Sequence, residues 1–543
     1  MHGNDPVHWQ QWSAYILKKA KQQNKLIFIS SGYFACHWCH VMQHENYQNT
    51  QTAQFLNQHF ISVKIDRELN PELDKALIEF AQKTTGHAGW PQHVILTPNG
   101  YPFAAFIYLP NKDLNSYLNR VIQLWETQPN KINQLAKESS KQQTVSDSQQ
   151  QLNGSNQINR AQFRSALLTQ VSSAKDDFSG GLKGTSKFPE APLLNALLSI
   201  KELPKEIEEW LILTLEQMQS QHLIDHINGG FYRYTVDPEW QTPHFEKMTY
   251  TNALLAQTYL IAGQRWQRKD FLQTAENTLN YLQTQLYSAD TKLYQSSQSA
   301  LDRLNQEGGN YLFSKQTLQK RLNKNEYEAV YQAWSLDQPS PYDLGWLPAP
   351  FKPNNTWQTV KQKLKTPSTQ IPKDTKSILG WNGLVLSTLS KAYLILNKEQ
   401  YKKSADQLAQ TLTDLIQTPK PPRALSQNGE FMGEANLQDY AFIKQGLTDY
   451  QAWSNNQNTA LALDFLNQKI PNLFFGVTGW RYDSTPILPQ QHGELVMPDN
   501  AISSPTAIVS CLKPKVAYQA QALLKAQAIQ YASYLNNLNC INR

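Results

Sequence analysis

The strongest constraint on the fold is the order of strand and helix patterns in the first 110 residues, with a Cys-x-x-Cys pair at one junction. Residues 26–30 form a short apolar run typical of a buried strand, and residues 36–58 follow it with a helical pattern that opens on "CHWC". A second strand at 60–66 and a helix beginning at Asn70 come next. Two apolar runs then flank Asn99-Gly100, a strong hairpin signal. This order predicts a small α/β domain over residues 1 to about 125.

The rest of the chain has a different pattern. Residues 126–160 read as the end of a helix followed by a linker rich in glutamine and serine. Helical periodicity dominates afterwards, for example at 252–266, 381–396 and 520–535, and glycine-aromatic loops recur between the helices. The recurring hairpins predict a closed (α/α)6 toroid over residues 161–543. The expected fold class is α/β plus all-α.

Charge and composition exclude several classes of function. A formal charge of +6 over 543 residues, without a basic block, gives little field per unit of surface, so we expect no nucleic-acid partner. We also expect no membrane partner, because no run of about 18 apolar residues occurs. The polar residues near the start do not resemble a signal peptide. With four cysteines, two of which (Cys511 and Cys540) we expect to be buried filler, the expected location is the cytoplasm.

Cys36 and Cys39 have the spacing of a dithiol site. If a helix begins at Cys36, its thiolate lies where unpaired N–H groups and the helix dipole favour negative charge, which lowers the thiol pKa. Cys39 follows one turn later and could resolve a mixed disulfide. The spacing therefore favours dithiol-disulfide exchange with a protein or small-molecule disulfide, without a cofactor or a metal.

Three alternatives remain for the same stretch. "CHWCH" matches the string that attaches c-type haem, and Cys36, Cys39, His40 and His44 are all metal-ligand types. Four ligands within nine residues of one helical stretch would converge poorly on a tetrahedral metal. The two cysteines could also be ordinary core residues.

Further residues could complete or tune the dithiol site. Pro91 follows Trp90 just before the hairpin strand, where a cis-proline would place extended backbone beside the thiols. Asp66 ends a strand and is a candidate proton acceptor, although an aspartate there could equally cap a loop. The side chains expected to influence the redox potential are His37, Trp38, His40 and Asp66.

A second group of candidate site residues lies at loop-to-helix junctions of the predicted toroid. "PHFEKM" at 243–248 brings a base, a carboxylate and an amine together, but it could also simply cap a helix. If the loops gather at one mouth, aromatic rings and carboxylates would line a pocket suited to sugar rings, or would only pack together. The candidates are Lys187, Arg233, Trp240, His244, Glu246, Lys247, Tyr250, Asn252, Trp381, Asn382, Asp439, Tyr440 and Asp499.

Several of these strings resemble one known family. "KLIFISSGYFACHWCHVM", "GHAGWPQHVILTPNGYPF", "PHFEKMTYTNALL", "GWNGL" and "LQDYAF" are similar to the spermatogenesis-associated thioredoxin-domain family over most of the chain. The resemblance implies a thioredoxin-like domain fused to a six-hairpin toroid like those of glycosidases and sugar epimerases. It also implies Cys36 as the nucleophile, Cys39 as the resolving thiol and Pro91 as the cis-proline. Thr251 stands where the family has an aspartate, which removes one carboxylate from the candidate toroid site.

Three functions follow as expectations. The first is a thiol-disulfide oxidoreductase with an appended toroid that binds carbohydrate. The second is a sugar isomerase, epimerase or glycosidase whose thioredoxin-like domain is structural or regulatory. The third is a binding protein without catalysis.

Overall fold

A computed structural model describes residues 2–149, 160–367, 369–484, 488, 493–513 and 520–538. The chain divides into two compact units. Unit 1 comprises Met1–Ser155 together with Phe474–Glu494, and unit 2 comprises Asn156–Leu473 and Leu495–Arg543. The segment Phe474–Glu494, far along the chain, therefore packs with the first unit, which the expected boundaries did not anticipate.

Unit 1 is built on a four-stranded sheet in the order β2-β1-β3-β4. β1 pairs parallel with β2 and antiparallel with β3, and β3 pairs antiparallel with β4 across the Asn99-Gly100 turn. The strands are β1 (Leu26–Gly32), β2 (Phe60–Asp66), β3 (Gln92–Leu96) and β4 (Pro102–Phe106). The helical elements are α1 (Ala14–Gln23), α2 (His37–Met42), η1 (Gln43–Tyr47), α3 (Thr50–His59), α4 (Pro71–Thr85), α5 (Asn111–Thr127) and α6 (Pro129–Gln149).

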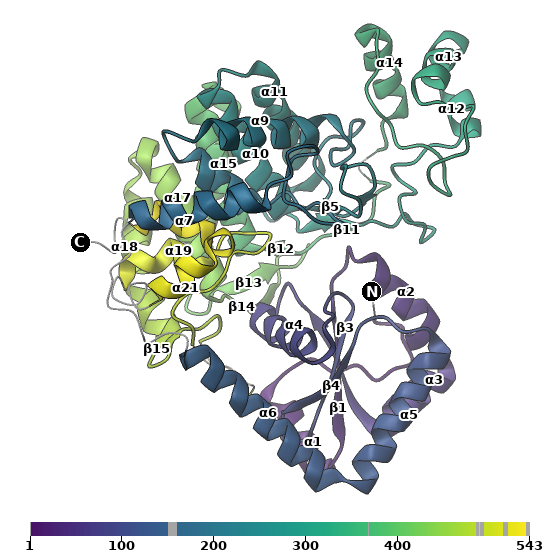
Figure 1. The fold of residues 1–543 in the computed structure, drawn as a ribbon, viewed down its shortest axis with the longest axis vertical. Helices are drawn as coiled ribbons and strands as arrows, with labels where there is room; N and C mark the ends of the chain where they lie inside the picture. Colours follow the sequence, from purple (N-terminus) through teal and green to yellow (C-terminus); the bar gives the residue numbers. More distant parts are fainter. Residues whose placement is uncertain are drawn as a thin grey trace. The chain divides into compact units, whose positions relative to one another are not determined.

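Helices cover both faces of this sheet (Figure 1). Leu26 and Phe28 of β1 point into a core with α2, α3 and α5, whereas Ile27 and Ile29 point into a core with α1 and α4. Both faces of β1 are therefore buried, which explains its unbroken apolar run. Unit 1 has the thioredoxin-like arrangement that the sequence predicts. Of the expected linker, 129–149 is the helix α6, and 150–159 lie outside the described residues.

Unit 2 is a ring of paired helices. Six helical segments, counted within the described residues, each pack on the next around a closed ring: α8, α10, α15, α17, α19 and η4, with η4 returning to α8. Their bounds are α8 (Ala191–Leu198), α10 (Thr249–Arg265), α15 (Leu379–Leu396), α17 (Leu437–Ser454), α19 (Pro505–Val509) and η4 (Ala528–Asn536). The remaining longer helices are α7 (Arg160–Ala174), α9 (Lys205–Ser220), α11 (Lys269–Tyr281), α16 (Glu399–Ile416) and α18 (Gln457–Phe474). This is the (α/α)6 toroid that the sequence predicts.

Close backbone contact holds the ring together at two glycines. A Cβ on Gly383 of α15 would come within 2.4 Å of the carbonyl oxygen of Phe442 in α17, and one on Gly446 would come within 2.4 Å of the carbonyl oxygen of Gly383. Only glycine permits this approach, so these two helices pack along their backbones. The helix expected at 520–535 is instead divided into α21 (Gln521–Ala526) and the 3-10 segment η4, with non-helical dihedrals at Tyr531.

Short strands and an extra helical group complete unit 2. The helices α12 (Lys315–Arg321), α13 (Lys324–Ala333) and α14 (Asn354–Leu364) pack around their own core, which includes Trp334, Trp346 and Trp357. The strands are β5 (Tyr234–Thr235), β6 (Pro243–His244), β7 (Lys247–Met248), β8 (Tyr287–Ser288), β9 (Leu293–Tyr294), β10 (Ser297–Gln298), β11 (Lys373–Asp374), β12 (Ser377–Ile378), β13 (Pro422–Leu425) and β14 (Phe431–Glu434). β15 (Phe475–Gly476) and β16 (Gly479–Trp480) belong to the segment that packs with unit 1.

Candidate functional site

Cys36 and Cys39 lie where β1 passes into α2. Cys36 is the N-cap residue of α2, and its sulfur accepts the backbone N–H of Cys39 at 3.1 Å. The two sulfurs are joined in a disulfide, and the residues are 3% and 1% exposed. A sulfur that accepts an N–H at a helix start is stabilised as a thiolate when the disulfide is reduced.

The end of the sheet forms the floor beneath the disulfide. Cys39 Sγ would lie 2.8 Å from a Cβ built on Gly32, so the glycine makes room for the sulfur. Gly32 pairs with Asp66 of β2. On the other side Ser31 pairs with Gln92, which places Pro91 beside Gly32. Three predicted site residues, Cys39, Asp66 and Pro91, thus surround one glycine.

The Trp90-Pro91 peptide is cis, as the sequence analysis expected. Trp90 is held at the edge of its ring by a hydrogen bond and at one face by a cation. Its indole N–H donates to Asp74 Oδ1 at 3.0 Å, and the Arg67 guanidinium carbon lies 3.9 Å from the centre of its ring. Asp74, which no sequence motif marked, also accepts the Ser31 hydroxyl at 2.6 Å, and burial raises its pKa.

The residues between and after the cysteines differ in exposure. Trp38 is 46% exposed, and its ring lies 4.9 Å from that of Tyr108. His40 Nε2 lies 2.8 Å from the Phe34 carbonyl oxygen, and burial lowers the pKa of His40 to about 4. His40 is therefore neutral at neutral pH and holds the turn before Cys36. The ring of His37 contacts that of Trp38 at 5.4 Å.

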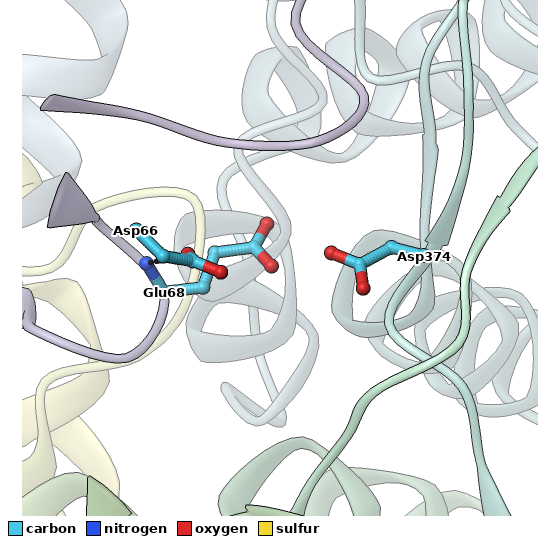
Figure 2. Close-up of side chains that lie close together, drawn as sticks. All are labelled: Asp66, Glu68 and Asp374. Carbon is cyan, nitrogen blue, oxygen red and sulfur yellow. Dashed lines mark hydrogen bonds between the residues drawn. The ribbon is translucent and has the colours of Figure 1, made fainter. Parts of the chain in front are cut away.

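Asp66 and Glu68 point from the end of β2 and the turn that follows (Figure 2). Asp66 Oδ1 accepts the backbone N–H of Glu68 at 2.9 Å, and its carbonyl oxygen accepts the side-chain amide of Asn70 at 3.0 Å. Asp66 thus closes a turn, one of the two roles considered for it. A proton-accepting role for Asp66 stays a prediction.

A polar network lies on the face of the sheet that Cys39 covers. It stands two residues before Gly32 along β1, and so farther from the start of α2. Ser30 of β1 pairs with Lys64 of β2 and with His93 of β3, so the three residues stand side by side. Tyr47 of η1 joins them, with its hydroxyl 2.5 Å from His93 Nε2 and 2.9 Å from Ser30 Oγ. Sequence reasoning missed this network. Its signal is a serine, a lysine and a histidine inside otherwise apolar strands.

In unit 2 two predicted site lysines fasten glycine-rich loops. Lys187 Nζ donates to Asp176 Oδ2 at 2.7 Å and to the Gly180 carbonyl at 2.8 Å. Lys247 repeats this arrangement with Asp225 Oδ2 at 2.5 Å and the Gly229 carbonyl at 2.9 Å, and its side chain is fully buried. Burial lowers the pKa of Lys247 against the attraction of Asp225.

Other predicted toroid residues also make contacts that hold the fold. Asn252 bonds both backbone groups of Phe231, and Asn382 does the same for Tyr294. Asp439 accepts an Arg423 N–H at 2.6 Å and the Gly380 N–H at 2.9 Å. The Trp240 indole, fully buried, donates to the Ser179 carbonyl at 2.8 Å. Asn252, Asn382 and Asp439 thus connect inner helices to the segments beside them, and Trp240 joins two loops.

Arg233, His244 and Glu246 form a cluster. The junction predicted His244 and Glu246 beside the amine of Lys247, but Lys247 pairs with Asp225 instead. Glu246 lies 3.2 Å from His244 Nδ1 and 3.3 Å from Arg233 Nη1. Burial lowers the pKa of His244, but the hydrogen bond and charge of Glu246 outweigh burial and leave it raised. The rings of Phe188, Tyr234 and His244 stack in sequence, with centroids 4.6 and 5.1 Å apart, and Phe188 is 41% exposed.

Tyr250, Trp381 and Tyr440 stand near the starts of three successive inner helices, α10, α15 and α17. The rings of Tyr250 and Trp381 meet edge to face at 4.8 Å. Within the described part of the chain, neither the Tyr250 hydroxyl nor the Trp381 indole N–H has a hydrogen-bond partner, although both residues are buried. Burial raises the pKa of Tyr440 to about 12.

Near the start of α8 one carboxyl group lies within reach of the charge of another. Asp499 accepts the backbone N–H of Ser504 at 2.7 Å and of Ser533 at 2.8 Å, and burial raises its pKa to about 6. Glu190 is the N-cap residue of α8 and has a left-handed backbone, with φ 49°. Burial and the charge of Asp499 raise the pKa of Glu190 to about 7. Asp499 is one of the residues predicted from the sequence, whereas Glu190 lies in no motif and was not predicted.

Residues 1–144 match the family Thioredox_DsbH, described as a protein of unknown function, DUF255. The chain is 33% identical to spermatogenesis-associated protein 20 of Rattus norvegicus over 340 residues, which cover 59% of this chain and 43% of that protein. It is 28% identical to the Mus musculus protein over 521 residues, which cover 83% of this chain and 65% of that protein. The chain is thus similar in sequence to spermatogenesis-associated protein 20.

This result confirms the family resemblance found in the motifs. The chain matches less than two thirds of the length of the rat and mouse proteins. An uncharacterized protein of Caenorhabditis elegans is 29% identical over 509 residues, which cover 82% of this chain and 69% of that protein.

Among solved structures, cellobiose 2-epimerase from Bacillus thermoamylovorans B4167 is similar, with a TM-score of 0.42 and 13% identity over 70% of this chain and 85% of the epimerase. A DsbH oxidoreductase is similar over 22% of this chain and 85% of its own, with 20% identity and a TM-score of 0.18.

Two expectations from composition can be compared with the structure. In the described ranges, no helix has the length and apolar character needed to cross a bilayer. Cys511 is partly exposed and disulfide-bonded, so it is not buried filler as the sequence analysis expected. Cys540 lies outside the described residues.

Proposed function

We propose that unit 1 is a thiol-disulfide oxidoreductase whose reacting groups are Cys36 and Cys39. The observation that supports this most is the bond between the two sulfurs at the start of α2, where Cys36 Sγ also accepts the Cys39 N–H. Neither thiolate is left for a metal or a haem in this oxidised state. The match of residues 1–144 to a thioredoxin-like family agrees with the proposal.

The reaction begins from the dithiol form. The Cys36 thiolate attacks one sulfur of a substrate disulfide, forms a mixed disulfide and releases the first substrate thiolate. Cys39 then attacks Cys36 Sγ, restores the intramolecular disulfide and releases the second thiolate. Two electrons pass to the substrate, and an external thiol donor must return them to Cys36 and Cys39. The substrate class is a protein or small-molecule disulfide.

The test compares two cysteine variants of the full chain. Reduction of a small aromatic disulfide, whose thiol product absorbs light, should disappear in Cys36→Ser. Cys39→Ser should keep the first attack and accumulate a mixed disulfide, which a mass spectrum detects. Turnover by Cys36→Ser equal to that of the unmodified chain would remove the proposal.

We also propose, as a second candidate, that unit 2 binds a sugar at the end of the ring where the inner helices begin. Two observations favour it. Glu190 and Asp499 form a carboxyl pair whose pKa values lie near neutral pH, the pattern of an acid and a base that share a site. The unpartnered polar atoms of Tyr250 and Trp381 are suited to hydroxyl groups of a ligand.

Stacked rings support this second candidate. Phe188, two residues before Glu190, is the exposed end of the stack that continues through Tyr234 to His244. An aromatic face beside carboxyl groups fits the apolar face and the hydroxyls of a sugar ring. Isomerase, epimerase and glycosidase chemistry would all use such a pair.

Tryptophan fluorescence during titration with cellobiose and with D-mannose tests sugar binding. Saturable binding should be lost in Glu190→Gln and kept in Glu239→Gln, which changes an exposed glutamate of the same unit. Binding without conversion of the sugar would indicate a binding protein rather than an enzyme. Equal binding by the Glu190→Gln variant would remove this candidate.

A further inference from the structure

The network of Ser30, Tyr47, Lys64 and His93 is an unusual group to bury beneath a disulfide. Ser30, Tyr47 and His93 are fully buried, and Lys64 is half-buried. The ring of Phe106 stacks on His93 at 4.5 Å, and Lys64 Nζ lies 5.6 and 5.2 Å from the centres of the Trp9 and Tyr47 rings. A lysine in such aromatic surroundings loses hydration, so its neutral amine is favoured. Burial lowers the pKa of Lys64 to about 7.

The hydrogen bonds of the network run in one direction. Lys64 Nζ donates to Ser30 Oγ at 2.8 Å, and the Ser30 hydroxyl can then donate to the Tyr47 hydroxyl at 2.9 Å. Tyr47 donates to His93 Nε2, and His93 Nδ1 donates to the Ile107 carbonyl oxygen at 3.3 Å. This assignment follows from the donors and acceptors available. Burial and the charge of Lys64 lower the pKa of His93 to about 3, so His93 stays neutral and accepts.

In this arrangement one member of the network gains or loses a proton near neutral pH. The Tyr47 hydroxyl stays protonated because burial raises its pKa, and His93 stays neutral. Lys64 can carry or release its proton while its bond to Ser30 is kept. The ammonium donates to Ser30 Oγ, and the neutral amine can accept the Ser30 hydroxyl when that hydroxyl turns from Tyr47 toward Lys64. The network therefore contains one proton acceptor, and Lys64 is hydrogen-bonded to Ser30, the member of the network that stands on β1 two residues before Gly32.

The sheet connects this acceptor with Cys39. Ser30 and Gly32 are two residues apart on β1, so their side-chain positions share a face and stand about 7 Å apart. Cys39 Sγ occupies the space over Gly32. A proton path across this gap requires water between Ser30 Oγ and Cys39 Sγ, and a water-mediated hydrogen bond is nearly as favourable as a direct one. Asp66, the other candidate acceptor, belongs to the row of Gly32 itself.

We propose that Lys64, acting through Ser30, accepts the proton that the Cys39 thiol must lose before Cys39 can resolve a mixed disulfide. The inference rests on the proposed oxidoreductase function. The Cys39 proton moves to the Lys64 amine, the Cys39 sulfur bonds to Cys36 Sγ, and the bond from Cys36 to the substrate sulfur breaks. The substrate leaves as a thiolate. The Lys64 ammonium later gives its proton to solvent. Lys64 is thus a positioning residue that does not touch the substrate.

The other charged and titratable groups around Lys64 determine how far it can serve this role. Asp5 and Asp66 attract its ammonium form, and His2, held neutral because burial lowers its pKa to about 4, lies on the same side. The two carboxylates keep the amine from losing its proton entirely, while burial keeps it from holding the proton too strongly. This balance leaves Lys64 able to accept and return a proton near pH 7.

The experiment follows the second half-reaction alone. The mixed disulfide of Cys36 with an aromatic thiol is prepared, and release of the coloured thiol is measured from pH 5 to pH 10 in the full chain. The unmodified chain should show a release rate that rises with a midpoint near pH 7. In Lys64→Met the midpoint should move toward the value of about 8.5 for an ordinary thiol, with release slowed about tenfold or more at pH 7. Lys112→Met, at an exposed lysine of unit 1, should not change the profile.

Two further variants separate proton acceptance from charge and from folding. Lys64→Arg keeps the positive charge but cannot accept a proton, so it should release the thiol as slowly as Lys64→Met. Ser30→Ala leaves Lys64 unchanged and removes the connection, so it should show the same alkaline shift even if Lys64→Met does not fold.

The outcomes distinguish this inference from the function on which it rests. A normal profile in Ser30→Ala, or a full rate in Lys64→Arg, overturns the role of Lys64 while release itself still shows a working dithiol site. If the unmodified chain itself does not release the thiol, or releases it equally well without Cys39, the oxidoreductase proposal fails as well.

Discussion

The sulfur of Cys39 occupies the place where a side chain of Gly32 would be, 2.8 Å from an ideal Cβ. Gly32→Ala should therefore displace the disulfide and destabilise unit 1 by about 1 to 3 kcal/mol, as overpacking does. A displaced disulfide is more easily reduced, so the reduction potential should rise. Thermal unfolding and redox titration measure the two effects.

Gly89→Ala is the matched control, because nothing lies within 4 Å of its Cβ position. It should leave both the unfolding temperature and the potential close to those of the unmodified chain. A Gly32→Ala chain that behaves like Gly89→Ala would show that Cys39 does not need this space.

The Lys247–Asp225 pair should dominate the stability of the loop at 225–230 in unit 2. Lys247→Met leaves the buried Asp225 carboxylate without its cation, and losses of about 3 to 5 kcal/mol are typical when one partner of a buried pair is removed. Denaturant unfolding measures the loss. The double variant Lys247→Met with Asp225→Asn should recover part of it, and a double variant no more stable than the single would contradict this account.

Glu190 should make the stability of unit 2 depend on pH. Its pKa is raised by burial and by the charge of Asp499 from 4.5 to about 7 in the folded state, so its contribution is fully present below pH 4.5 and is lost as pH rises through 7. Glu190→Gln cannot ionise. It should match the unmodified chain at pH 4 and exceed its stability at pH 8 by about 1 to 2 kcal/mol, a value reduced for partial exposure.

Chemical denaturation at the two pH values checks this prediction. A difference between the variant and the unmodified chain that does not grow from pH 4 to pH 8 would mean that Glu190 is not held protonated by its surroundings. The same result would weaken the proposal that Glu190 and Asp499 form an acid–base pair.

Local patterns predicted much of the fold. The unbroken apolar run of β1 indicated a strand buried on both faces, Asn70-Pro71 marked the start of α4, and Asn99-Gly100 marked the hairpin. Each signal is contained in a few neighbouring residues, as is the Cys36-x-x-Cys39 spacing. The sequence analysis could therefore place the dithiol at a strand-to-helix junction.

The missed residues depend on pairing across the fold. Ser30, Lys64 and His93 come together only because β2, β1 and β3 align them in one row, and their separations of 34 and 63 residues hide the relationship. Glu190 comes within reach of the charge of Asp499 only because the helical ring closes. Lys187 and Lys247 show the opposite case, residues that the sequence suggests as pocket residues but that hold loops in place. Both stand at polar junctions, and each forms an ion pair with an aspartate of a glycine-rich loop.

The most direct test of the central claim is mass-spectrometric thiol trapping of the full chain across a series of glutathione redox buffers, following Cys36 and Cys39. The account predicts one reversible two-electron transition, with Cys36 alkylated faster than Cys39 in the reduced form. Sulfurs that stay paired at every poise, or that never pair, would contradict a working dithiol site.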